Sequence, residues 1–166
     1  MSELAINAGT SQPVIDNLQL QGFQFHTRME MTLPDVPRDL TELDDEGLMG
    51  LFGELTSYAN FLNAQYACAV IDEKNAENAL DFEESKGFIN AHEENKKETV
   101  TLMKARLATN PTIVHLKESL SAKYAYRKLI EVMVNNVERN TTLISRELTR
   151  RTASGNTFTR GQRMFP

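Results

Sequence analysis

The sequence is poor in cysteine, in long apolar runs and in recognisable catalytic motifs. Its one cysteine, Cys68, excludes an internal disulfide and is typical of proteins of the reducing cytoplasm. No apolar run approaches the roughly 18 residues that a membrane-spanning helix needs. The N-terminus also lacks the basic and then apolar pattern of a signal peptide. We therefore expect a cytoplasmic protein without membrane contact.

The motifs that would carry out a reaction are also missing. His26, His92 and His115 are isolated, and none lies at metal-ligand spacing from a second histidine. We find no EF-hand loop, Walker A loop, dinucleotide fingerprint or nucleophile elbow. Cys68 follows Ala67 and precedes three small or apolar residues, which predicts a core-facing thiol rather than a nucleophile. We therefore expect no enzyme, no metal site and no cofactor.

Two long stretches carry apolar residues at alternating steps of four and three. The first extends from residue 41 to about 89, and nine of the eleven positions sampled from Leu48 to Glu83 are apolar. The second extends from 111 to 151, and eight of the eleven positions sampled from Ile113 to Leu148 are apolar. Patterns of this length predict a mainly α fold, built on a long antiparallel, coiled-coil-like helical hairpin.

A hairpin this thin is not expected to shield its apolar stripe within one copy, so the pattern predicts a homo-oligomer. Two basic residues interrupt the stripe, Lys123 and Arg127. They fix the helix register, or pair with Glu73 and Glu83 across the seam, or belong to a binding surface. We assign oligomerisation to the main apolar positions, which are Leu48, Phe52, Leu55, Leu62, Ile130, Val134, Val137 and Ile144.

Composition divides the chain into three regions. Residues 1–40 are predicted to form an extended arm, because apolar and polar residues alternate between Leu18 and Leu33 as in a β-ribbon. Residues 41–151 form the helical hairpin domain. Residues 152–166 mix serine, glycine and asparagine with arginine, which predicts a flexible basic tail.

Local signals mark the ends of the helices. Thr41 and Asp44 have the form of a capping box at the start of the first long helix. Gly87 and residues 90–97 give the best break after it. A short helix is expected from Val100, ending at Asn110-Pro111, where the asparagine caps the second long helix.

The formal charge of −5 conceals a strong asymmetry. Residues 41–98 carry a net charge of −10, whereas residues 99–166 carry +8. Opposite charge on the two helices favours antiparallel packing or a complementary contact between copies. It is also compatible with a basic surface for an anionic partner. The basic residues from position 117 onward are Lys117, Lys123, Arg127, Lys128, Arg139, Arg146, Arg150, Arg151, Arg160 and Arg163, with Tyr124, Tyr126, Phe158 and Phe165 among them.

Three parts of the sequence follow one another along the chain: Tyr58-Ala59-Asn60 with Leu62, then Lys96-Lys97 with Met103, and then the predicted helix over 120–151. Together they resemble the recombination mediator proteins of T4-type phages. The resemblance covers somewhat over half of the chain and lies in the pattern of elements. It implies a non-catalytic homo-oligomer that binds single-stranded DNA in the bacterial host cell. Such a protein helps a recombinase replace the single-strand binding protein.

Charge, rather than the family, selects the residues that we expect to contact DNA. One cluster lies near the helix junction and the other towards the C-terminus; together they are Lys96, Lys97, Lys104, Arg106, Arg146, Arg150, Arg151, Arg160 and Arg163. The alternative interpretation is a structural assembly protein, a phage virion or scaffold component with interlocking arms. A third is a host-directed inhibitor whose acidic helix mimics nucleic acid.

Overall fold

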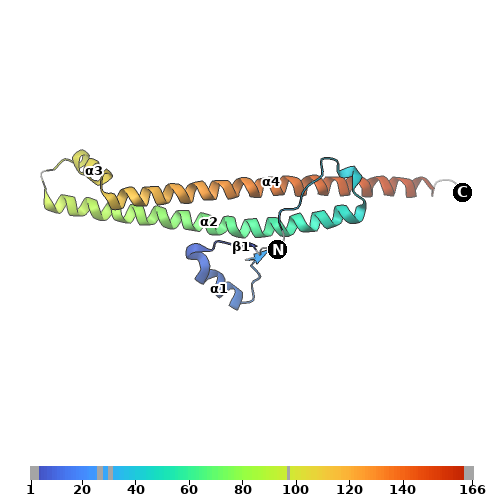
Figure 1. Ribbon diagram of the computed structural model, residues 1–166, viewed down its shortest axis with the longest axis horizontal. Helices are drawn as coiled ribbons and strands as arrows, with labels where there is room; N and C mark the ends of the chain where they lie inside the picture. The colour runs from blue at the N-terminus through green and yellow to red at the C-terminus, as the bar shows by residue number, and fades with distance from the viewer. Residues whose placement is uncertain (1–3, 26–27, 30–31, 97, 163–166) are drawn as a thin grey trace. The chain divides into compact units, whose positions relative to one another are not determined.

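The computed structural model describes residues 4–25, 28–29, 32–96 and 98–162, and the chain is mainly helical (Figure 1). Its elements in chain order are β1 (Leu4–Ala5), the 3-10 helix η1 (Gly9–Ser11), α1 (Gln12–Leu20), β2 (Arg28–Met29), the 3-10 helix η2 (Leu40–Glu42), α2 (Asp45–Glu94), α3 (Val100–Ala108) and α4 (Pro111–Gln162). Within the part of the chain that the structure describes, no helix combines the length and the apolar character needed to cross a membrane.

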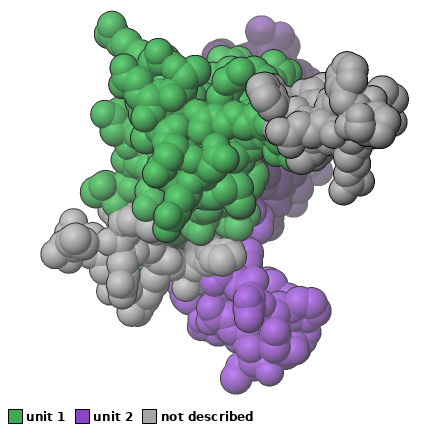
Figure 2. All heavy atoms as spheres, turned by 90° about the vertical axis from the view of Figure 1, so that its right-hand side faces the viewer, with its two compact units in different colours: residues 1–6, 26–64, 131–166 green, residues 7–25, 65–130 purple. Residues whose placement is uncertain are grey.

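The chain divides into two compact units, which Figure 2 colours separately. Unit 1 comprises residues 1–6, 26–64 and 131–166, and unit 2 comprises residues 7–25 and 65–130. Each unit therefore contains one part of α2 and one part of α4. The three regions expected from composition follow the order of the chain instead, and that division stays a prediction.

In unit 1, an apolar seam joins the first part of α2 to the last part of α4. Leu48 and Leu55 of α2 and Ile144 of α4 are fully buried in it. Leu62, Val134 and Val137 are buried as well, and Phe52 is half-buried. In unit 2, Ile130 is also buried. The residues that we assigned to oligomerisation are therefore covered, wholly or in part, within a single chain.

This burial corrects the reason for expecting an oligomer. Each helix supplies the partner surface that the other needs, so the stripe itself does not require a second copy. Any contact between copies has to use other side chains. In unit 1 the exposed large apolar residues include Met49, Val132 and Leu143. The oligomer itself stays a prediction.

Unit 2 packs the second part of α2 against α3 and the first part of α4. Met103 of α3 and Ile113 of α4 are buried in its core. At Gly87 of α2, an added Cβ would lie 2.6 Å from Leu107 Cδ2, so a larger residue there would require the Leu107 side chain of α3 to move. Cys68 is buried, which confirms the core-facing thiol expected from its neighbours.

The N-terminal arm differs from the predicted β-ribbon. Residues Gln12–Leu20 form helix α1, so the ribbon is wrong over Leu18 to Leu20. Pro13 favours a helix because it lies in the first turn, where its missing N–H has no intrahelical partner to lose. The strands in the described residues are β1 and β2, which pair antiparallel with Leu4 opposite Met29 and Ala5 opposite Arg28. His26, Glu30 and Met31 lie outside the described residues.

Several helix boundaries agree with the local signals, but α2 continues through Gly87 to Glu94, so the break predicted at Gly87 and over 90–97 begins only at residue 95. Helix α3 covers Val100–Ala108, and α4 begins at Pro111 with the Thr112 N–H donating to Asn110 Oδ1 at 2.9 Å, as the cap prediction requires. The predicted capping box is wrong, because Asp44 accepts from the Gly47 N–H at 2.7 Å and caps α2 itself. Thr41 lies in η2 instead, where Asp39 accepts from its N–H and its hydroxyl.

The C-terminal end of α4 also differs from the prediction. We expected the helix to end near Arg151 and a flexible tail to follow, but α4 continues to Gln162. Serine, glycine and asparagine each weaken a helix by at most about 1 kcal/mol. Without proline in this stretch, such residues do not have to end the helix. Residues Arg163 and Phe165 lie outside the described residues.

Candidate nucleic-acid interface

In unit 1, one face of α4 presents two exposed arginines among polar side chains. Asn135, Arg139, Thr142 and Arg146 are separated by four, three and four residues, which places them on the same side of the helix. All four are exposed. In the part of unit 1 with described side chains, neither arginine forms an ion pair with a carboxylate. We call these four residues the arginine face.

Two shallow grooves border the arginine face and are open to solvent. One is lined by α4 alone, with Asn135, Glu138, Arg139, Thr142, Leu143 and Arg146. The other lies between α4 and the first part of α2 and adds Phe52, Thr56, Ala59, Asn60, Thr141 and Ser145. Arg146 and Thr142 line both grooves. Glu138 also lines both grooves. Its negative charge offsets one of the two arginines, so the surface carries a net charge of +1.

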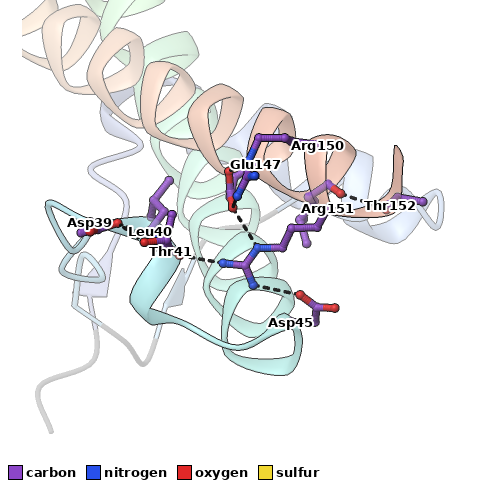
Figure 3. Close-up of polar contacts among 9 residues, drawn as sticks. Asp39, Leu40, Thr41, Asp45, Glu147, Arg150, Arg151 and Thr152 are labelled. Atoms are coloured by element: carbon purple, nitrogen blue, oxygen red, sulfur yellow. Dashed lines mark hydrogen bonds and ion pairs between the residues drawn. The ribbon is translucent and has the colours of Figure 1, made fainter. Parts of the chain in front are cut away.

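The two arginines that follow on α4 are engaged within the fold (Figure 3). Glu147 accepts hydrogen bonds from Arg150 Nε and Nη2 at 2.7 and 2.6 Å, and from Arg151 Nε at 2.8 Å. These two guanidinium groups lower the pKa of Glu147 to about 2, with Arg150 contributing first and Arg151 second. The carboxylate therefore stays ionised at neutral pH and neutralises part of their charge.

Arg151 also fastens the start of α2 to α4. Its Nη1 donates to Asp45 Oδ1 at 2.8 Å and its Nη2 donates to the carbonyl oxygen of Leu40 at 2.9 Å. The three acceptors come from η2, the first turn of α2 and α4, and Figure 3 shows the guanidinium group between them. The role of Arg151 in this arrangement is structural. Replacing it would disturb the fold of unit 1 as well as its surface charge.

The predicted basic cluster near the helix junction belongs to unit 2. Arg106 Nη2 donates to Glu94 Oε2 at 3.0 Å, and Arg106 Nη1 lies 3.9 Å from Glu98. Lys96 is exposed, and Lys104 is exposed on a groove with Phe88. Lys97 and Arg163 lie outside the described residues, and nothing is described of the Arg160 side chain.

Lys123 and Arg127 both pair with carboxylates of α2, as one interpretation of the sequence expected. Arg127 forms an ion pair with Glu73, one of the two predicted acceptors, and its guanidinium carbon lies 5.4 Å from the centre of the Tyr124 ring. Lys123 Nζ lies 3.1 Å from Asp72 Oδ2, which was not among the predicted partners. Both residues thus join α4 to α2 in unit 2.

Sequence reasoning counted Arg139 among the basic residues of the last helix but did not assign it to a site. The signal was available, because Arg139 and Arg146 are seven residues apart and therefore share a helix face. The polar neighbours Asn135 and Thr142 were not noticed either. Their position on the exposed face of α4 follows only once the opposite face of that helix is known to be buried.

Among the described residues, no group of three or more histidine, cysteine, aspartate or glutamate side chains is arranged to hold a metal ion. In comparisons with family models, curated proteins and solved structures, no match to this chain was found.

Proposed function

We propose that this chain is a non-catalytic DNA-recombination accessory protein of a phage. In this proposal it is a homo-oligomer of antiparallel, coiled-coil-like helical hairpins, acting in the cytoplasm of the bacterial host. It binds single-stranded DNA and helps a recombinase replace the single-strand binding protein. The arginine face of α4 supplies the DNA contact.

One observation supports this assignment above the others. Arg139 and Arg146 are exposed and have no carboxylate partner among the described side chains, in contrast to Arg106, Arg150 and Arg151. A guanidinium group without such a partner can donate two parallel hydrogen bonds to a phosphate oxygen pair. Asn135 and Ser145 provide further donors beside it. Contacts of this kind bind the backbone of a single strand without reading its sequence.

The test is a titration of a labelled single-stranded oligonucleotide, followed by fluorescence anisotropy. We expect the wild type to bind at low salt and to lose affinity steeply between about 50 and 200 mM salt, because bound cations are released from the phosphates. The double variant Arg139→Glu/Arg146→Glu should bind at least about tenfold more weakly, since it replaces two attractions by two repulsions.

Arg38→Glu is the matched control. Arg38 is an exposed arginine of the same unit, outside the arginine face, and its replacement changes the net charge per site by the same amount. The proposal requires the control to bind like the wild type. The double variant changes the net charge by −4 and the control by −2. A loss of log affinity in the control half as large as in the double variant would therefore indicate a general charge effect, and no binding of the wild type at low salt would exclude the function.

A structural assembly protein is the second candidate, and the exposed apolar residues of the N-terminal segment favour it. Leu20 at the end of α1 is 88% exposed, and Val14 and Phe23 are about 60% exposed. Apolar side chains this accessible suit a contact with a neighbouring copy in a virion or scaffold. Mass spectrometry of purified phage particles distinguishes the candidates, because a recombination accessory protein should be missing from them.

A further inference from the structure

Residues 7–15 in unit 2 are attached to α2 mainly by polar contacts. The Asn7 N–H donates to Gln65 Oε1 at 2.6 Å, and Gln65 Nε2 donates back to the Asn7 carbonyl oxygen at 3.2 Å. Gln65 is buried, and a buried amide needs hydrogen-bond partners. The backbone of this segment provides them. Asp72 lies two helical turns after Gln65 on α2. Its Oδ1 accepts from both the N–H and the hydroxyl of Thr10, at 3.1 and 2.7 Å.

The Asp72 carboxylate is the central acceptor of this attachment. Its other oxygen accepts from Lys123 Nζ at 3.1 Å, although the residue is only 7% exposed. Burial by itself would raise the pKa of Asp72, but the hydrogen bonds from Thr10 and Lys123 outweigh it and hold this pKa below its ordinary value. The segment is thus bound to an ionised, directional acceptor.

Gly9 allows the segment to approach that carboxylate. Its φ of +49° lies in the left-handed region, and a Cβ on it would lie 2.2 Å from Asp72 Oδ2. Because the carboxylate is held by Thr10 and Lys123, it has little freedom to move aside. A side chain at position 9 is therefore incompatible with the attached state.

The segment covers the only cysteine of the chain. Ala8, Ser11 and Ile15 are each at most 5% exposed, and Cys68 on α2 is 1% exposed. The Ser11 hydroxyl lies next to the Cys68 thiol, and burial raises the pKa of that thiol. Only Ala8 and Ile15 add apolar burial from the segment itself, far less than the seam between the long helices.

We propose that residues 7–15 form a latch that opens and closes on α2 without unfolding of the helices, and that the closed latch shields the Cys68 thiol. Directional hydrogen bonds and two apolar side chains hold the latch, whereas long apolar seams hold the helices. Local opening then requires less free energy than global unfolding. This inference is independent of DNA binding.

The test follows the reaction of Cys68 with Ellman's reagent in the native protein over a series of low urea concentrations. Local opening exposes little surface, so the labelling rate should depend only weakly on urea. Asp72→Asn weakens the charge-assisted hydrogen bonds from Thr10, and should accelerate labelling about ten- to a hundredfold. Asp81→Asn, an exposed aspartate on the same helix, is its matched control and should label at the wild-type rate.

A second pair of variants leaves α2 unchanged. Gly9→Ala should accelerate labelling because its Cβ collides with Asp72. Gly22 also has a positive φ, +89°, but a Cβ there would meet nothing within 4 Å. Gly22→Ala should therefore not accelerate the labelling of Cys68. Circular dichroism confirms that the helices persist in each variant. If the labelling rate of the wild type depends on urea as steeply as global unfolding does at every concentration, the proposal is wrong. Equal labelling rates for the two glycine variants would also overturn it.

Discussion

Adjacent residues of α4 offer a direct test of the seam in unit 1. Ile144 is fully buried, whereas Leu143 is 52% exposed. Truncation of a fully buried isoleucine to alanine costs about 2–5 kcal/mol, through lost transfer free energy and the cavity left behind. Leu143→Ala removes a side chain that water already reaches, and should cost less than about 1 kcal/mol. Both substitutions introduce alanine, the best helix former, so helix propensity does not explain a loss of stability in either variant.

The assay is thermal unfolding followed by circular dichroism, with urea unfolding as a second measure. In a chain of this length, 1 kcal/mol corresponds to about 2–4 °C in Tm, so a loss of about 3 kcal/mol lowers the Tm of Ile144→Ala by roughly 6–12 °C. Leu143→Ala should stay within about 4 °C of the wild type. Equal losses in the two variants, or no loss in Ile144→Ala, would refute the burial of this seam within one chain.

Two further predictions concern particular contacts. Because the pKa of Glu147 falls from 4.5 to about 2 in the folded chain, its ionised form contributes stability that is fully present above pH 4.5 and is lost as the pH falls through 2. Acid unfolding should therefore be less steep over this window in Glu147→Gln than in the wild type, and identical profiles would contradict the assignment. Asn110→Ala removes the acceptor of the Thr112 N–H and should lower the free energy of unfolding, measured in urea, by about 1 kcal/mol. Asn110→Ser keeps a side-chain oxygen at this position and should retain most of that stability.

The parts of the fold that the sequence predicted well are those set by local chemistry or by long periodicity. Asn110 followed by Pro111 marks a helix start by itself, and α4 begins there. The spacing of apolar residues over dozens of positions identified the buried faces of α2 and α4, including Leu55 and Ile144. A pattern sustained over many turns averages out local exceptions.

The failures have physical causes as well. The alternation from Leu18 is too short to separate strand from helix, and Pro13 favours a helix just before it. The assignment of Arg150 and Arg151 to DNA rested on charge alone and stays a prediction, but the ion pairs that both residues form within the chain were missed. Their shared partner Glu147 lies three and four residues earlier and could have been considered from spacing. The contact of Arg151 with Asp45 joins residues 106 positions apart, and no local rule predicts it.

The central proposal is that the arginine face of α4 binds the backbone of single-stranded DNA, and its most direct test is the dependence of affinity on salt. Each phosphate neutralised on a single strand adds about 0.7 to the slope of log affinity against log salt. Arg139→Ala/Arg146→Ala should therefore lower the magnitude of this slope by about 1.4, while Arg38→Ala leaves it unchanged. An unchanged slope in the double variant would show that these arginines do not contact phosphate.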